Sequence, residues 1–159
     1  IDPSVLAFLL DHGAFQNIDE CLEVLNHHSG ILGVSEISRD MREVQRQLST
    51  NQQAALAIKM FVKRICDYIG AYWLELGGAD AIIFTGGIGE NDCLIRDMIC
   101  RRLECLGISF RPRYNQTHQL PFDFSNTDSS THLLAIPTNE ELMIARDTFA
   151  LVAKSAVEE

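Results

Sequence analysis

The sequence contains no apolar run that approaches the roughly 18 residues of a membrane-spanning helix, so we expect no membrane partner. Basic residues are also scarce: 13 Lys and Arg stand against 22 Asp and Glu, which gives a net charge of −9. Such a chain offers no basic stripe to neutralise a nucleic-acid backbone, and we therefore expect no nucleic-acid partner. A single nucleotide is compatible with this charge, because it needs only local donors and usually brings Mg²⁺.

Cysteine pairs of the form C-x-x-C are absent as well, and the number of cysteines is odd. Four of the five lie within helical apolar patterns, which predicts buried free thiols in a reducing compartment. Nothing in the sequence resembles a secretory signal. Together these features predict a cytoplasmic protein. The cysteines are Cys21, Cys66, Cys93, Cys100 and Cys105.

The length of 159 residues and the apolar fraction of 47% fit one domain with a hydrophobic core. We therefore expect residues 1–159 to form a single domain. The chain begins with Ile1-Asp2-Pro3 rather than with Met, so we expect it to be a fragment of a longer protein.

Apolar residues alternate between helical and strand periods along the chain. This pattern predicts an α/β layered fold. Helices are predicted over residues 3–12, 18–26, 51–76, 92–106 and 138–152, and strands over 79–84, 108–110 and 132–136. Residues 29–34 read as a glycine-punctuated turn, 38–42 as a polar segment, and 111–131 as a long surface excursion.

Two of these helices carry a capping-box pattern at their start, Thr50 with Gln53 and Thr138 with Glu141. Apolar spacing also assigns the inward faces. The helix at 92–106 is expected to bury Leu94, Ile95, Met98, Ile99, Leu103 and Leu106, and the last helix Leu142, Ala145, Phe149 and Val152.

The most informative segment is a short apolar strand that ends in Gly86-Gly87-Ile88-Gly89-Glu90-Asn91 and is followed by a helix. Glycines let a ligand approach the backbone, and a helix start presents unpaired N–H groups to an anion. The segment lacks a P-loop Lys, and Asp92 stands where the dinucleotide fingerprint needs a third small residue, which disfavours a nicotinamide oxidoreductase. Two interpretations remain: a phosphate site, or a tight connection with Asn91 or Asp92 as N-cap.

Two further segments allow either a chemical or a purely structural interpretation. Glu140 and Glu141 follow the last strand; Glu141 completes a capping box, which leaves Glu140 available to hold Mg²⁺ near a phosphate. Within residues 38–42, Arg42 is suited to a base or a phosphate, but the segment also fits a solvated helix start.

These segments together resemble the carboxylate kinase family of acetate and propionate kinases. The resemblance covers residues 29–35, 38–42, 80–91 and 136–147, in the family's order and spacing. It implies the C-terminal half of a kinase that moves a phosphoryl group reversibly between ATP and a short-chain carboxylate. It also implies a ribonuclease-H-like lobe of the ATPase fold shared by actin, sugar kinases and acetate kinase, and a homodimer.

Residue by residue, the resemblance places Asp40, Met41 and Arg42 against the nucleotide. It places Gly86, Gly87, Ile88, Gly89, Glu90 and Asn91 around the ribose and phosphates of ATP or ADP, and Glu140 at Mg²⁺.

The family's catalytic Asn, Arg pair and His belong to its N-terminal lobe. We therefore expect no catalytic residue in these 159 residues, weak nucleotide binding at best and no turnover by this chain alone. Acetate or propionate would bind through that other lobe. The alternative is a non-catalytic module of the same fold that serves nucleotide sensing or dimerisation.

Overall fold

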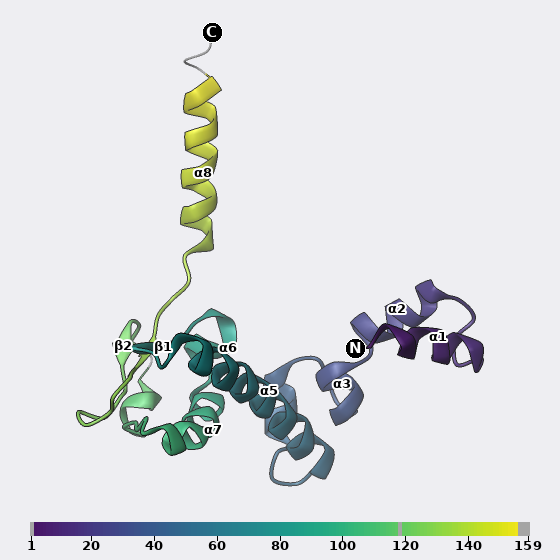
Figure 1. The fold of residues 1–159 in the computed structure, drawn as a ribbon, viewed down its shortest axis with the longest axis horizontal. Helices are drawn as coiled ribbons and strands as arrows, with labels where there is room; N and C mark the ends of the chain where they lie inside the picture. The colour runs from purple at the N-terminus through teal and green to yellow at the C-terminus, as the bar shows by residue number, and fades with distance from the viewer. Residues whose placement is uncertain (1, 118, 156–159) are drawn as a thin grey trace. The chain divides into compact units, whose positions relative to one another are not determined.

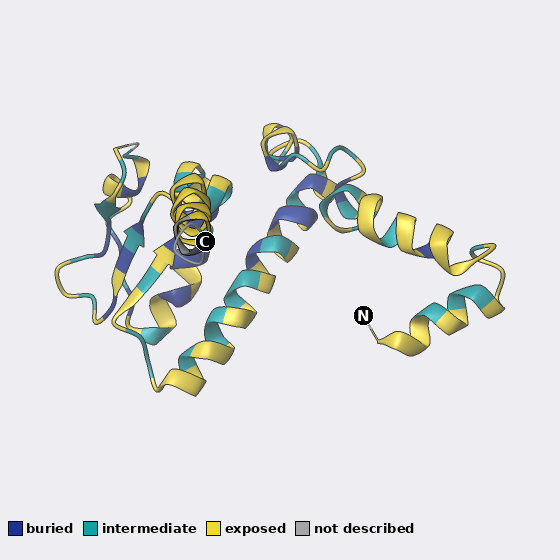
Figure 2. Ribbon diagram, turned by 90° about the horizontal axis from the view of Figure 1, so that it is seen from above, coloured by how far each residue is buried: buried dark blue, intermediate teal, exposed yellow. Residues whose placement is uncertain are grey.

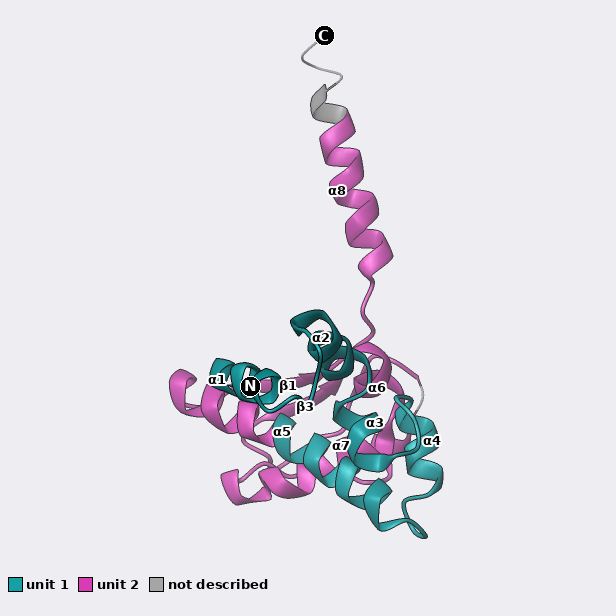
Figure 3. Ribbon diagram, turned by 90° about the vertical axis from the view of Figure 1, so that its right-hand side faces the viewer, with its two compact units in different colours: residues 1–65 teal, residues 66–159 magenta. Residues whose placement is uncertain are grey.

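The computed structural model describes residues 2–117 and 119–155, and the backbone contacts divide them into two compact units, residues 1–65 and 66–159 (Figure 3). None of the helices in the described residues is both long enough and apolar enough to cross a bilayer.

The first unit is helical (Figure 1). It holds α1 (Pro3–Asp11), α2 (Ile18–His27), α3 (Gly30–Ser35), α4 (Met41–Arg46) and the first half of α5 (Gln52–Leu76). The glycine-punctuated turn expected at 29–34 is thus the short helix α3, and the polar segment at 38–42 includes the start of α4. Asp40 caps α4 through its side chain, and this local hydrogen bond allows so short a helix to begin.

The core of the first unit forms where α4 and the first half of α5 bury their apolar sides. Figure 2 shows this as dark blue on the first turns of α5. Its fully buried members include Val44, Ala54, Ile58 and Val62. Asn51 caps α5 by accepting hydrogen bonds from the N–H groups of Gln53 and Ala54, at 2.8 and 3.2 Å. The capping box predicted at Thr50 is therefore wrong by one residue.

The second unit contains a three-stranded sheet in the order β1-β3-β2. Strand β1 (Ala81–Phe84) pairs in parallel with β3 (His132–Ala135), in a register that joins Ala81 to His132. Strand β2 (Phe122–Asp123) pairs antiparallel with β3. The remaining elements are α6 (Gly86–Asn91), α7 (Cys93–Leu103), the 3-10 turns η1 (Glu104–Leu106) and η2 (Tyr114–Gln116), and α8 (Glu140–Ser155).

The core of this unit lies between α7 and the sheet. Phe124 and Leu133 are fully buried, as are Ile108 and Cys100, and burial raises the pKa of the Cys100 thiol to about 12. The expected strand at 108–110 is reduced to one bridge between Phe110 and Ser125.

Two sequence interpretations are corrected in the second unit. The supposed surface excursion at 111–131 supplies β2 and the buried side chains of Asn115 and Phe124, so part of it belongs to the core. The inward face predicted for the last helix is instead exposed, with Phe149 at 75% and Val152 at 64% (Figure 2).

The five cysteines are free thiols as expected, but only Cys21 and Cys100 are buried.

Replacing a core and an exposed phenylalanine tests this assignment. Phe124→Ala should lower the free energy of unfolding by about 3–5 kcal/mol, because a fully buried ring leaves a cavity. Phe149→Ala should change it by no more than about 0.5 kcal/mol, as at other surface positions. Urea unfolding followed by circular dichroism measures both, and equal losses would contradict the assignment.

Candidate functional site

The carboxyl ends of β1 and β3 lie next to each other because the two strands run in parallel. The pairing continues one step past the strands, where the N–H of Ile136 donates to the carbonyl of Phe84 at 3.0 Å. Open α/β sheets place ligands at such an edge. Two segments leave the sheet here: α6 after β1, and residues 136–139 after β3, which we call the post-β3 segment.

The glycines of α6 have separate structural roles. Gly86 has a φ of +69°, which lets the chain turn from strand to helix within one residue of Thr85. A Cβ on Gly89 would lie 2.9 Å from the carbonyl carbon of Phe84, so this glycine lets the helix rest on β1. A Cβ on Gly87 would meet nothing within 4 Å, and Gly87 is exposed. The backbone is therefore open to a ligand at Gly87.

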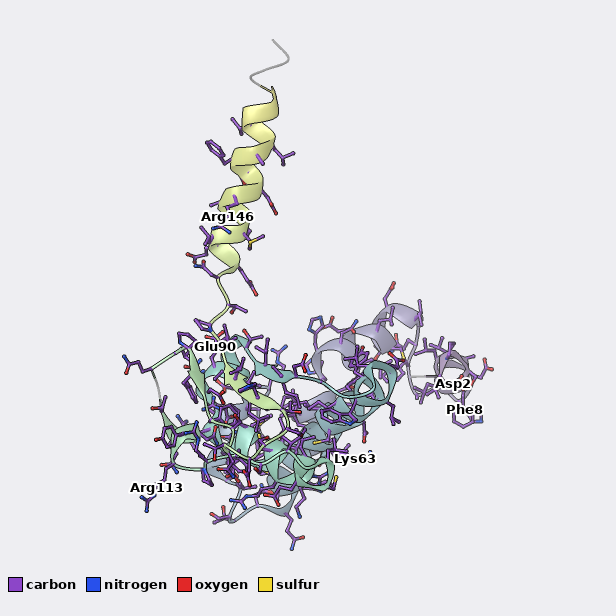
Figure 4. All side chains as sticks on the ribbon, turned by 60° about the vertical axis from the view of Figure 1, so that its left-hand side comes forward. Asp2, Phe8, Lys63, Glu90, Arg113 and Arg146 are labelled. Carbon is purple, nitrogen blue, oxygen red and sulfur yellow. The ribbon has the colours of Figure 1, made fainter. Side chains whose placement is uncertain are left out.

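Glu90 joins α6 to the post-β3 segment. Its Oε1 accepts hydrogen bonds from the N–H of Gly86 at 2.9 Å, the N–H of Thr138 at 2.9 Å and the hydroxyl of Thr138 at 3.0 Å. Figure 4 labels Glu90 where α6 meets the chain that leads into α8.

The contacts with Thr138, first the N–H and then the hydroxyl, hold the pKa of Glu90 below its usual value. A carboxyl with a lowered folded-state pKa stabilises the fold above its unfolded-state pKa and loses that contribution as the pH falls through the folded-state pKa. This link is therefore intact at neutral pH.

Glu140 is the first residue of α8 and is exposed. Asn139 caps the helix, accepting from the N–H of Leu142 at 3.1 Å, so the capping box predicted for Thr138 and Glu141 is wrong by one residue. Among the described residues, no group of three or more His, Cys, Asp or Glu side chains gathers to hold a metal. A lone carboxylate fits Mg²⁺ well, since this ion is usually held by one or two carboxylates, waters and substrate phosphates.

Asn91 and Ile88 are the other two residues of α6 that the resemblance assigns to the nucleotide. Asn91 donates from its side-chain amide to the carbonyl of Gly87 at 3.0 Å, within the helix. Ile88 is half-buried. Asp92 then caps α7 by accepting from the N–H of Ile95 at 3.0 Å, which settles the choice of N-cap between Asn91 and Asp92.

A buried arginine that sequence reasoning missed binds the C-terminal carbonyls of α6. Arg96 on α7 is 1% exposed and donates to the carbonyls of Gly89 and Glu90 at 2.8 and 2.9 Å. It also donates to the side-chain and backbone oxygens of Asn115, both at 2.7 Å. The amide of Asn115 in turn donates to the carbonyl of Cys93 at 2.8 Å.

Burial lowers the pKa of Arg96. Neutral dipoles stabilise its charge: the carbonyls at the C-terminal end of α6 carry partial negative charge, and the rings of Phe122 and Phe124 lie 5.5 and 5.8 Å from the guanidinium carbon. Arg96 thus holds the end of α6 in place.

Leu94, expected to point inward, is 36% exposed instead.

The remaining predicted site residues lie in the first unit. Arg42 is exposed and pairs with Asp40, with Nη2 at 2.6 Å from Oδ2. The hydrogen bond from this guanidinium lowers the pKa of Asp40 to about 2. Met41 is 7% exposed and belongs to the core of that unit. Of the predicted residues in the second unit, Glu90 joins α6 to Thr138 of the post-β3 segment, and Glu140 follows that segment as the first residue of α8.

A hollow of about 420 Å³ lies elsewhere in the second unit. Trp73, Gly77, Asp80 and Thr131 are among its lining residues. It lies at the amino ends of β1 and β3, away from the edge where parallel strands place ligands. It does not overlap the candidate site.

Comparison with known proteins gives consistent matches. The sequence profile of the Acetokinase family matches residues 1–146. An acetate kinase of Fructilactobacillus sanfranciscensis is 44% identical over 97% of this chain and 39% of its own length. An acetate kinase of Lactiplantibacillus plantarum is 46% identical over 92% of this chain and 37% of its own length.

Solved structures agree with these matches. The chain is similar to Porphyromonas gingivalis acetate kinase, with a TM-score of 0.85 and 37% identity over 96% of this chain and 38% of that one. The chain is also similar to a propionate kinase from Francisella tularensis, with a TM-score of 0.82 and 36% identity. The match covers 91% of this chain and 37% of that one. The predicted α/β fold class, the actin-like ATPase fold of these kinases, is confirmed. The chain spans less than two fifths of the relatives it matches.

Two glycine substitutions separate packing from openness in α6. Gly89→Ala should cost about 1–3 kcal/mol of unfolding free energy, because the new methyl group would push against the backbone of Phe84. Gly87→Ala should stabilise the helix by up to about 1 kcal/mol, since alanine has the higher helix propensity and meets nothing. Urea unfolding distinguishes them; a costly Gly87→Ala would refute the open position.

Loss of the buried arginine is expected to be far more costly than loss of an exposed one on the same helix. Arg96→Met should lower the unfolding free energy by at least about 3 kcal/mol, because several buried carbonyls lose their donor. Arg101→Met removes an exposed ion pair with Asp97 and should cost less than about 1 kcal/mol. Thermal and urea unfolding measure both, and similar losses would argue against the network.

Proposed function

Because the chain belongs to the acetokinase family, we propose that it forms the nucleotide- and Mg²⁺-binding half of a short-chain carboxylate kinase. The complete protein would transfer the terminal phosphoryl group of ATP to acetate or propionate, giving an acyl phosphate and ADP, and would run in reverse. The observation that carries the proposal is the meeting of α6 and the post-β3 segment at the carboxyl ends of two parallel strands.

The chemistry of this edge suits a nucleotide with a divalent cation. Gly87 leaves the backbone open, so phosphate or ribose oxygens could approach the main chain closely. A nearby carboxylate would repel a bare phosphate, but with Mg²⁺ between them the repulsion becomes attraction, which is the role assigned to Glu140. Phosphoryl transfer depends mostly on positioning and charge neutralisation, and these residues contribute to both.

In the first unit, the exposed guanidinium of Arg42 would lie against the nucleotide. Asp40 keeps that side chain beside the start of α4 through a hydrogen-bonded ion pair. Met41 stands between Asp40 and Arg42 in the sequence, and its side chain lies in the core. Together the three residues would fix the position of the planar guanidinium group of Arg42.

Assembly and location complete the proposal. The second half of α5 exposes Leu74 at 82% and Leu76 at 72%, and Tyr72, which stacks on Tyr68, at 57%. A helix with so many exposed apolar residues suits a homodimer contact. We propose that the protein is cytoplasmic and that it forms a homodimer. Light scattering of the purified protein tests the dimer.

A calorimetric titration of the chain with ADP, with and without Mg²⁺, tests the proposed site. Binding should strengthen with Mg²⁺. Glu140→Ala should remove that gain, whereas its neighbour Glu141→Ala should keep it. Arg42→Ala should weaken binding with or without the metal, whereas Arg46→Ala on the same helix should not.

Two results would contradict this proposal. One is parent-like binding of Mg–ADP by both Glu140→Ala and Arg42→Ala. The other is a folded chain, by circular dichroism, that binds no ADP at all, a result that favours a non-catalytic module that serves dimerisation.

A further inference from the structure

The carboxylate of Glu90 is already engaged by the protein itself. Its Oε1 accepts three hydrogen bonds, one from α6 and two from Thr138. A negatively charged group beside a phosphate would also repel it. The resemblance places Glu90 among the residues around the nucleotide, whereas these contacts argue that it acts on a ligand through the segments that it joins.

The backbone of the post-β3 segment explains why this link matters. Sheet pairing ends at Ile136, whose N–H donates to Phe84. Pro137 has no N–H to donate. The next donor is the N–H of Thr138, and Glu90 accepts it. Beyond the sheet, Glu90 therefore directs the path of the chain.

Glu140 stands only two residues after Thr138, at the start of a helix capped by Asn139. A shift of Thr138 would be passed on to Glu140 through this short connection. On the other side, the same Oε1 binds the N–H of Gly86, next to the open backbone of Gly87. One oxygen atom thus fixes both segments.

We propose that Glu90 is a positioning residue that couples nucleotide binding at α6 to cation binding at Glu140. The inference rests on the proposed function, because it concerns the same nucleotide and Mg²⁺. Coupling of this kind is reciprocal: the cation tightens the nucleotide by the same factor as the nucleotide tightens the cation. Breaking the link should reduce that factor while leaving each segment folded.

The test is the ratio of ADP dissociation constants without and with Mg²⁺, measured by calorimetry on the chain and its variants. Glu90→Ala should lower the ratio about fivefold or more, within the usual range of coupling between sites. Metal-free ADP affinity should fall by a smaller factor than the affinity measured with Mg²⁺, because a positioning residue acts mainly on the coupling between the two sites. Glu104→Ala, which removes an exposed acid from the same unit, should leave the ratio unchanged.

Conservative variants and a double variant sharpen the test. Glu90→Gln keeps an acceptor without the charge and should give an intermediate ratio, because charge-assisted hydrogen bonds are the stronger ones. Thr138→Ser keeps the hydroxyl and should behave as the parent, whereas Thr138→Val should lower the ratio. Combining Glu90→Ala with Glu140→Ala should lower the ratio no further than Glu140→Ala alone.

Each other outcome has a definite meaning. An equal loss of ADP affinity with and without Mg²⁺ in Glu90→Ala would make Glu90 a direct contact and overturn the inference. If Glu90→Ala lowered the melting temperature but left the ratio of ADP dissociation constants unchanged, Glu90 would have only a structural role. That result would also overturn the inference. A parent chain without Mg²⁺-dependent ADP binding would refute the proposed function itself, and this inference with it.

Discussion

Parallel pairing of β1 with β3 is the contact on which the candidate site depends. It sets the carboxyl ends of the two strands side by side, and the bond from Ile136 to Phe84 extends that alignment to the point where both segments leave the sheet. Beyond that point, side-chain contacts replace the sheet's hydrogen bonds. Glu90 fixes the separation between α6 and Thr138 with a single oxygen atom. The sheet therefore brings the segments close, and the carboxylate defines their geometry.

Arg96 supplies the opposing support. A six-residue helix cannot be stable by itself, since so few turns do not compensate the cost of nucleating it. Here its first N–H is bound by Glu90, and the carbonyls of Gly89 and Glu90 are bound by Arg96. Gly89 rests directly on β1. The N-terminal N–H of α6, its C-terminal carbonyls and the side that packs on β1 are all engaged. The helix leaves its backbone exposed at Gly87.

Sequence patterns predicted the long helix α5, the strands that correspond to β1 and β3, and the glycine segment, because periodicity and glycine spacing act locally. They failed where two residue types compete. At the start of α8, Thr138 fits a capping box, but Asn139 caps the helix and frees Thr138 for Glu90. On α7, position 96 has the spacing of the buried face, but apolar periodicity passes over a charged residue and places Leu94 inward instead. Such choices depend on distant partners such as Asn115, which no local pattern contains.

The register that joins Ala81 to His132 also bears on the order of folding. These partners lie some fifty residues apart along the chain, and contacts between distant residues form slowly because a large loop must close first. The cap of α7 by Asp92 is local and can form early. We therefore expect the edge that gathers α6 and the post-β3 segment to form late as the chain folds, so that a ligand for this edge encounters a nearly finished protein.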